Sequence, residues 1–443
     1  MSSVAFDYNL KEIENSVIKS DSKFPWHDFI GKLFNPDNIP PPILLRPIVE
    51  NIISNGDIDI IYPEEWIDDY LKYIGTICEA NALHFLLRSY DRRGSTLKIY
   101  NLDADSWIQI DIHIKLYQFG SSRIYFKWQD FFPRAQCFSG VLEPDAADGA
   151  ALYLLHLEVQ RKKLSSPSVT ARWNIYQNRL TQIDVTKTEL DEIIESAYRD
   201  GALFKDKDIH FKIRQQLLDR LNLSRDHFFT SFMAHTGQKI QKFFGRYFLK
   251  SKKIFFVGAD GAGKTSLMRA LSHSTKIIPN VKTHRGYLFY RIAKKISKKR
   301  GNGTQASDVF PRFFFLVSVF RTGIIFLINT KRIIFFDRSP NDILITNRKN
   351  DKISLYSSSK FLTRLTAGIF TVHVHSKNND QFENKKNEMT DRQIKLYNSF
   401  MYQINIDQRP NNYLHFINAP SIDKSAEILR KILGNAGVVV NEK

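Results

Sequence analysis

The stretch FFVGADGAGKTSL, residues 255–267, decides the fold of the second half of the chain. Within it, G-x-x-x-x-G-K-[ST] runs from Gly258 to Thr265, after an apolar run and before the helix-forming run SLMRALSH. This order predicts a phosphate-binding loop between a buried strand and a helix. The glycines let backbone N–H groups close around a phosphate, and the helix N-terminus adds the positive end of its dipole.

The loop predicts ATP and Mg²⁺ as cofactors. Lys264 is expected to reach the outer phosphates and Thr265 to ligate Mg²⁺. The alternative is a chance match to the motif, which would not be expected to have a strand before the loop and a helix after it. The predicted ATP-binding residues of the loop are Gly258, Gly261, Gly263, Lys264, Thr265 and Ser266.

A second motif follows about seventy residues later, in RIIFFDRSPND. An apolar strand ending in Asp337 puts a carboxylate at the carboxyl edge of the sheet, where it can help to hold Mg²⁺. Arg338 beside it can bind an anionic group. The alternative is a structural ion pair after a strand.

Apolar runs alternate with helical segments from residue 252 onward, in KIFFVG, RIIFFD, IFTVHVH and YLHFIN. Strands that are apolar on both faces and separated by helices are typical of a parallel sheet covered on both sides. The predicted fold class is therefore α/β, with a parallel sheet that carries the P-loop. The predicted domains are a mixed α+β domain over 20–150, a helical connector over 151–248 and the P-loop domain over 249–437.

Three aspartates in the first half suggest another metal site. Asp57 and Asp59 are two apart in GDIDII and so share one face of a strand. Asp111 lies on a second strand, WIQIDIH, with Gln109 and His113 on the same face and the isoleucines on the other. Such a trio can bind two Mg²⁺ ions that grip a nucleoside triphosphate. Arg46, shortly before Asp57, is the candidate contact for the triphosphate. The alternative is a set of solvated carboxylates beside a turn.

GADGAGKT and FFDRS together resemble the thymidylate kinase branch of the nucleoside monophosphate kinases, over about residues 252–435. The resemblance implies that Asp260 contacts a sugar hydroxyl of the acceptor and that Arg338 binds its phosphate. Arg285, in KTHRGY, stands where the family has an Arg-Glu-Pro segment and is a third expected acceptor contact. The catalytic set implied is Lys264, Asp337, Arg338 and Asp260.

The resemblance also implies a lid that supplies cations, because the loop itself has Gly261-Ala262 and no basic residue before Lys264. Its counterpart here is FENKKNEMTDRQ, with Lys385, Lys386 and Arg392 as the expected ATP contacts. The alternative is an ordinary charged surface helix.

The first half resembles the nucleotidyltransferase fold of polymerase-β-like enzymes, through the aspartates described above. The order of the parts resembles bacterial two-domain proteins that pair such a domain with a thymidylate kinase-like domain, often in surface-polysaccharide synthesis. A second, nucleotidyl-transferring activity is therefore a further hypothesis.

Charge is divided unevenly along the chain. Residues 1–250 hold 31 Lys and Arg against 33 Asp and Glu, whereas residues 251–443 hold 33 against 13, a net charge of +20. A basic half suits phosphate-rich ligands or an anionic membrane surface. Nucleic acid ranks lower as a partner because no base-reading motif is present, and a homodimer is a further candidate.

The remaining features favour a cytoplasmic protein, with peripheral attachment to the inner membrane face as an alternative. Only two cysteines are present and the N-terminus is acidic where a signal peptide is basic. The apolar run over 313–329 contains Arg321 and is shorter than the ~20 residues of a membrane span. We expect it to form a buried helix, or a helix pair, next to a core strand.

The leading hypothesis is a Mg²⁺-dependent kinase that transfers the γ-phosphoryl group of ATP to a phosphorylated small molecule, either a nucleotide or a sugar phosphate. The alternative from another class is a nucleotide-switched scaffold that docks on anionic membrane or nucleic acid.

Overall fold

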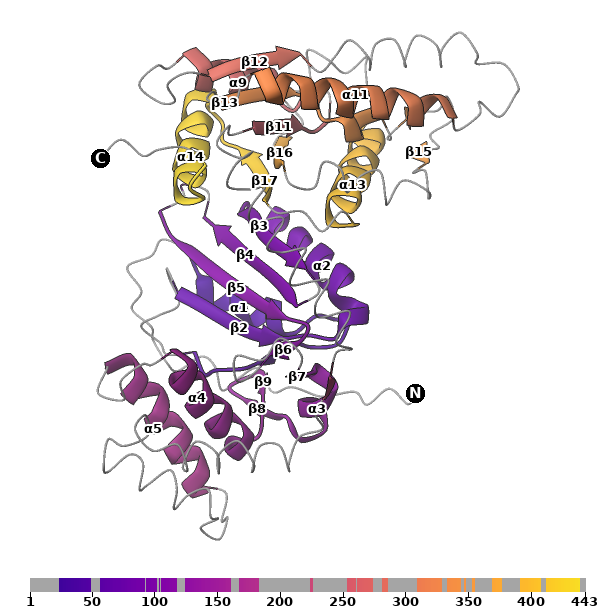
Figure 1. The fold of residues 1–443 in the computed structure, drawn as a ribbon. Helices are drawn as coiled ribbons and strands as arrows, with labels where there is room; N and C mark the ends of the chain where they lie inside the picture. The colour runs from indigo at the N-terminus through magenta and orange to yellow at the C-terminus, as the bar shows by residue number, and fades with distance from the viewer. Residues whose placement is uncertain are drawn as a thin grey trace. The chain divides into compact units, whose positions relative to one another are not determined.

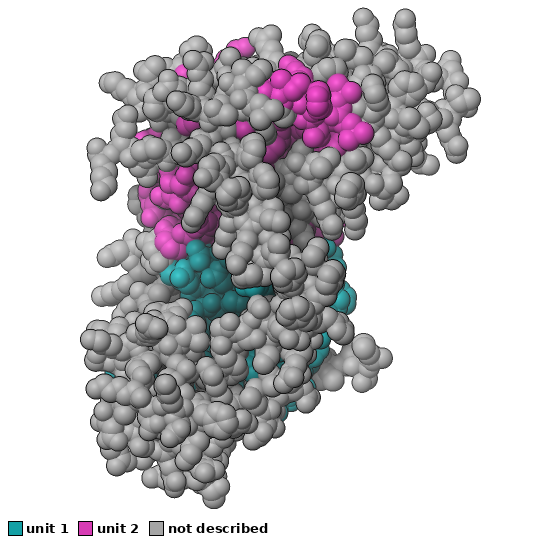
Figure 2. Space-filling view, in the orientation of Figure 1, with its two compact units in different colours: residues 1–70, 92–96, 108–235 teal, residues 71–91, 97–107, 236–443 magenta. Residues whose placement is uncertain are grey.

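The computed structural model of the chain contains two compact units, which Figure 2 colours separately. Unit 1 comprises residues 1–70, 92–96 and 108–235, and unit 2 comprises residues 71–91, 97–107 and 236–443. The residues that the structure describes are 24–48, 56–91, 93–101, 103, 105–117, 124–160, 167–182, 224–225, 253–259, 261–273, 281–285, 309–328, 333–343, 346–347, 353–354, 369–376, 391–407 and 412–438.

In the sheet part of unit 1, β2 (Gly56–Ile61) lies between β1 (Ile43–Leu44) and β5 (Trp107–His113). Figure 1 shows β2 beside β5. Strands β2 and β5 run parallel, and β1 runs antiparallel to β2. The isoleucines of β5 are buried and its polar residues are half-buried. This confirms the alternation expected from the sequence, because successive strand side chains point to opposite faces.

The helices of unit 1 include α1 (Trp26–Phe34), α4 (Ala146–Gln160) and α5 (Pro167–Gln182). Helix α1 buries its apolar side chains at helical spacing. Within the predicted helical connector over 151–248, the described residues 151–160 and 167–182 are helical, in α4 and α5, whereas 224–225 form a short strand, β10. The other elements that unit 1 holds are β6 (Leu116–Tyr117), β7 (Ile124–Phe126), α3 (Trp128–Phe131), β8 (Gln136–Phe138), β9 (Val141–Glu143), β10 (Ser224–Arg225) and the short 3-10 helices η3 (Glu64–Trp66) and η4 (Phe132–Arg134).

Unit 2 contains a mostly parallel sheet with strand order β3-β17-β16-β11-β13-β12. All neighbouring pairs from β17 to β12 are parallel, and β3 pairs antiparallel with β17. The α/β fold class and the parallel sheet predicted from the sequence are therefore confirmed. The strands are β3 (His84–Asp91), β17 (Tyr413–Asn418), β16 (Phe370–Ser376), β11 (Lys253–Val257), β13 (Ile333–Asp337) and β12 (Val281–Arg285).

Helices cover both faces of this sheet (Figure 1). Every residue of β11 is buried, and alternate residues enter different cores. Ile254 and Phe256 pack in a cluster with α9 (Lys264–His273) and α14 (Ile422–Asn435). Phe255 and Val257 pack in a second cluster with α11 (Val309–Ile328) and α13 (Asp391–Asp407). Burial of each Phe of this strand stabilises the fold by about 1.5–3 kcal/mol, so the strand that precedes the loop is held firmly in the core.

Unit 2 also takes in chain segments from the first half of the sequence. In β3, Leu86 pairs with Leu414 of β17 and joins the core under α14. The compact units therefore do not coincide with the predicted division at residues 150 and 248. Helix α2 (Ile67–Ala80) and strand β4 (Gly94–Tyr100) begin in unit 1 and end in unit 2. The remaining elements of unit 2 are η5 (Pro340–Ile343), β14 (Thr346–Asn347) and β15 (Ile353–Ser354).

The apolar run at 313–329 lies largely in the single helix α11, so the predicted helix is confirmed, but the prediction that it is buried is only partly correct. Phe315 is buried beside core residues of β11 and β13, whereas Phe320 on the same helix is 72% exposed. In the part of the chain that the structure describes, no helix combines the length and the hydropathy needed to cross a bilayer.

Candidate phosphate-binding site

The loop between β11 and α9 needs glycine at two positions where backbone and side chains approach closely. Gly258 has φ +140° and Gly263 has φ +85°, both in the region that glycine favours. A Cβ at Gly258 would lie 2.4 Å from the carbonyl oxygen of Val374, and one at Gly263 would lie 2.8 Å from Nδ2 of Asn418. Asn418 also donates from Nδ2 to the carbonyl of Ala262 at 2.6 Å, so the end of β17 holds the loop.

Lys264 is the first residue of α9, and its ammonium group lies against the inside of the loop. Its Nζ donates to the carbonyl oxygens of Gly258 and Ala259, both at 2.7 Å. The side chain is only 6% exposed. The predicted loop residues Gly258, Gly261, Gly263 and Lys264 are thus brought together, with one cation placed at the start of a helix where anions are favoured.

The structure also brings together the two predicted metal ligands of this site. Asp337 is the last residue of β13, and it pairs in register with Phe256 near the end of β11. The Oγ1 of Thr265 donates to Oδ2 of Asp337 at 3.1 Å. Thr265 and the neighbouring Ser266 are exposed. A hydroxyl and a carboxylate at the carboxyl edge of a parallel sheet are the hard oxygen ligands that Mg²⁺ prefers.

Arg338 is buried, and its backbone adopts a left-handed conformation with φ +85°. Its N–H donates to the carbonyl of Phe256 at 2.9 Å, and Nη1 donates to Oδ1 of Asp342 at 3.2 Å. Asp342 also accepts hydrogen bonds from the hydroxyl of Tyr397 and from the N–H of Ser339. A strained non-glycine residue beside a candidate site is a common feature of functional sites.

Sequence reasoning predicted that Arg338 faces the acceptor and missed the partners that hold it. The available signal was Asp342, four residues after Arg338 in DRSPND. Tyr397 lies 59 positions later on α13 and carried no sequence signal for this contact. The role of Arg338 in binding the acceptor stays a prediction.

The other predicted residues of this site are described in part or not at all. Arg285 ends β12 and pairs in register with Asp337, which places its backbone beside the candidate metal ligand. Arg392 lies near the start of α13. Asp260, Lys385 and Lys386 lie outside the described residues.

In unit 1, the parallel register places Asp59 opposite Asp111 and Asp57 opposite Gln109. Asp59 forms an ion pair with Arg46. From the sequence, Arg46 was instead the candidate contact for a triphosphate. Nε2 of His113 lies 3.4 Å from Oδ1 of Asp59. Burial lowers the pKa of His113, and the nearby Arg46 lowers it further although Asp111 opposes the shift, so this ring is neutral at pH 7.

The proposed metal site of these aspartates stays a prediction. Over the described parts of the chain, one group of three His, Cys, Asp or Glu residues brings its ligand atoms within 4.8 Å of one another, and it is formed by His373, His375 and His415. Sequence reasoning missed these histidines, although HVH in IFTVHVH placed two of them on one strand face.

Comparisons with known proteins leave the family of the chain open. The sequence matches no protein-family model and no curated protein. Solved structures that match include thymidylate kinase from Candida albicans, at 14% sequence identity and a TM-score of 0.30, with 44% of this chain and 96% of that chain covered. A likeness this low carries no argument about function, so the proposal that follows is drawn from the site itself.

Proposed function

We propose that unit 2 is a Mg²⁺-dependent phosphotransferase that binds ATP at residues 258–265 and transfers its γ-phosphoryl group to a phosphorylated small molecule. One observation carries the proposal. The hydroxyl of Thr265 and the carboxylate of Asp337 lie 3.1 Å apart at the head of a loop whose inner side holds the ammonium of Lys264.

The triphosphate would be bound by three features of this chain. The glycines give the backbone close access to the phosphate oxygens, and the N-terminus of α9 contributes its partial positive charge. Lys264 supplies a full charge, and burial strengthens its interaction with an anion. When a phosphate binds, the hydrogen bonds from Nζ to the loop carbonyls would be replaced by hydrogen bonds to phosphate oxygens.

Mg²⁺ fits the residues at this edge of the sheet, because both donors of the pair are oxygen atoms of small side chains. Thr265 would bind the ion directly and Asp337 would bind it directly or through water. When bound, Mg²⁺ supplies neutralisation of charge on the β- and γ-phosphate oxygens. The rest of the catalysis is positioning, since phosphoryl transfer needs little covalent chemistry from the protein.

The acceptor would bind beside the same sheet edge. Arg338 is the proposed contact for its phosphate, with Arg285 and Asp260 as further contacts. In the structure Arg338 pairs with Asp342, so an acceptor phosphate would compete with or share that partner. An Arg that is already oriented by a carboxylate loses less conformational freedom on binding a phosphate.

The test is transfer of labelled γ-phosphate from ATP to a panel of nucleoside monophosphates and sugar phosphates, with product masses read out. We expect Lys264→Ala to abolish transfer while the thermal unfolding curve stays close to that of the parent chain. Lys431→Ala is the matched control, because Lys431 lies on α14 and pairs with Asp105 away from the loop. Transfer that survives Lys264→Ala would contradict the proposal.

A further inference from the structure

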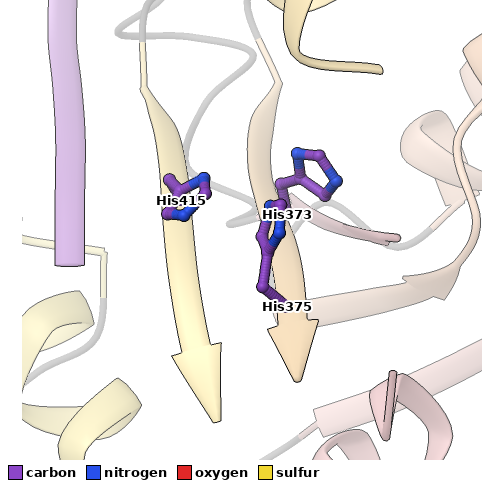
Figure 3. Close-up of side chains that lie close together, drawn as sticks. All are labelled: His373, His375 and His415. Atoms are coloured by element: carbon purple, nitrogen blue, oxygen red, sulfur yellow. The ribbon is translucent and has the colours of Figure 1, made fainter. Parts of the chain in front are cut away.

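Three histidines lie together in the core of unit 2, on neighbouring strands (Figure 3). His373 and His375 are two residues apart on β16, so their side chains share one face of the sheet. His415 on β17 is the register partner of His373 and therefore faces the same side. The residues between and beside them pack into the opposite core, under α9 and α14: Val372, Val374, Leu414 and Phe416.

The three rings are close enough to share one ion. One nitrogen from each ring lies within 4.8 Å of the nitrogens of the other two. The ring of His375 lies between the others, with centroid distances of 4.1 Å to His373 and 3.9 Å to His415. All three side chains are buried, and the most exposed of them, His375, is 6% exposed.

Half of the six ring nitrogens in this group have no hydrogen-bond partner among the described residues. These nitrogens are Nε2 of His375 and both Nδ1 and Nε2 of His415. A neutral imidazole has one donor and one acceptor, and a buried polar atom left unpaired is unfavourable by about 1–3 kcal/mol. Buried polar atoms are normally bonded to a partner, and a single metal ion could bind several of these nitrogens at once.

His373 is oriented by partners outside the group. Its Nδ1 lies 2.7 Å from the hydroxyl of Tyr413, and its Nε2 lies 3.3 Å from Oδ1 of Asn398 on α13. If one nitrogen ligates a metal, the other can keep its neighbour, as metal-binding histidines commonly do.

We propose that His373, His375 and His415 form a binding site for a divalent transition-metal ion, with Zn²⁺ as the first candidate. Imidazole nitrogens suit Zn²⁺ and its neighbours in the first transition row, whereas Mg²⁺ prefers oxygen. Zinc binds nitrogen at about 2.0–2.1 Å, so two ligands at a tetrahedral angle lie ~3.3 Å apart. The ligand nitrogens, which lie within 4.8 Å of one another, would have to move to that spacing by rotation of the rings, and water or hydroxide would take the fourth position.

The site lies directly behind the phosphate loop. His373 pairs in register with Val257, the residue before Gly258. The carbonyl of Val374, between the two β16 histidines, is the group that Gly258 approaches. A metal that ties β16 to β17 would therefore stabilise the strands that support the loop. This role is independent of the proposed kinase activity, because it requires only that unit 2 folds.

The test uses the full chain, freed of metal with a chelator and then titrated with Zn²⁺. We expect one ion per chain to bind and the thermal unfolding midpoint to rise. At a free Zn²⁺ concentration 100 times the dissociation constant, the ratio of folded to unfolded chain increases about 100-fold. His375→Phe and His415→Phe should each remove the bound ion and the zinc-dependent rise.

These two variants are expected to fold, because Phe keeps the aromatic volume and removes the unpaired nitrogens. His27→Gln is the matched control, since His27 is an exposed histidine on α1, and it should bind zinc as the parent chain does. X-ray absorption of the zinc-loaded parent chain needs no variant and should show three imidazole ligands at about 2.0–2.1 Å. The proposal fails if the parent chain binds no zinc, if either Phe variant keeps the zinc-dependent stabilisation, or if the zinc ligands are not imidazoles.

Discussion

Replacing Gly258 by Ala tests how closely the phosphate loop packs on the sheet. The added Cβ would lie 2.4 Å from the carbonyl oxygen of Val374, which is backbone and cannot rotate away. The backbone at this position also has φ +140°. Both effects act against Ala, so the variant should destabilise unit 2 and weaken ATP binding.

The expected size follows from two separate contributions. A non-glycine residue held in a sparsely populated backbone region costs about 1–3 kcal/mol. Forcing an extra carbon into a packed site costs about 1–3 kcal/mol more. The free energy of unfolding should therefore fall by roughly 2–6 kcal/mol, which lowers the unfolding midpoint by on the order of 10 °C.

Two further glycines separate these contributions. Gly437 has φ +70°, but a Cβ there would meet nothing within 4 Å, so Gly437→Ala should show the backbone contribution alone. Gly31 lies in helix α1 with equally open space and no positive φ, so Gly31→Ala should be neutral or stabilise by about 0.5–1 kcal/mol. Thermal and denaturant unfolding would measure all three variants. If Gly258→Ala unfolds no more readily than Gly437→Ala and binds ATP as tightly as the parent chain, the close packing of the loop is refuted.

Two further predictions concern single side chains. Cys78 is fully buried and burial raises its pKa, whereas Cys137 is exposed. In the native protein a thiol reagent should therefore modify Cys137 and leave Cys78 unmodified until the chain unfolds. Equal labelling rates of the two cysteines, measured by mass spectrometry, would contradict this. Burial lowers the pKa of Lys253 to about 8. The unfolded chain, with a Lys pKa near 10.5, binds the proton more tightly, so the stability of unit 2 should rise as the pH increases from about 8 to about 10.5. Lys253→Met should flatten that rise in denaturant unfolding measured across this pH range, and an unchanged slope would count against the burial of the charge.

The loop and its partner aspartate were predictable from the sequence because they depend on local order. Gly258 to Thr265 are consecutive, and their pattern demands a strand before and a helix after. Asp337 ends an apolar run, and the carboxyl ends of parallel strands meet at one edge of the sheet. The contact between Thr265 and Asp337 therefore follows from motif and sheet type together.

Contacts that depend on strand register or on distant helices were not predictable. The histidine group forms only because His415 pairs with His373, and nothing local fixes that register. Asp342 could be noticed near Arg338, but Tyr397 reaches it from another helix. Strand β3 joins β17 over more than three hundred residues, a pairing that short-range patterns do not encode.

The same limit applies to unit 1. Alternation predicted which residues of β5 face the core, and the structure agrees. It did not predict that Arg46 pairs with Asp59, because Arg46 lies beyond the end of β1 and its partner was fixed by the antiparallel pairing of β1 with β2. The charge of Arg46 alone suggested a triphosphate contact, whereas in the structure Arg46 forms an ion pair with Asp59.

The dependence of ATP affinity on Mg²⁺ tests the central claim most directly. Calorimetric titration of ATP with and without Mg²⁺ should show tighter binding with the ion in the parent chain. That gain should fall at least about tenfold in Thr265→Val and in Asp337→Asn, since each removes an oxygen ligand or its charge. Ser272→Ala, a hydroxyl lost further along the same helix, should keep the full gain. If the gain from Mg²⁺ is the same in all four proteins, Thr265 and Asp337 do not hold the metal and the proposed site is wrong.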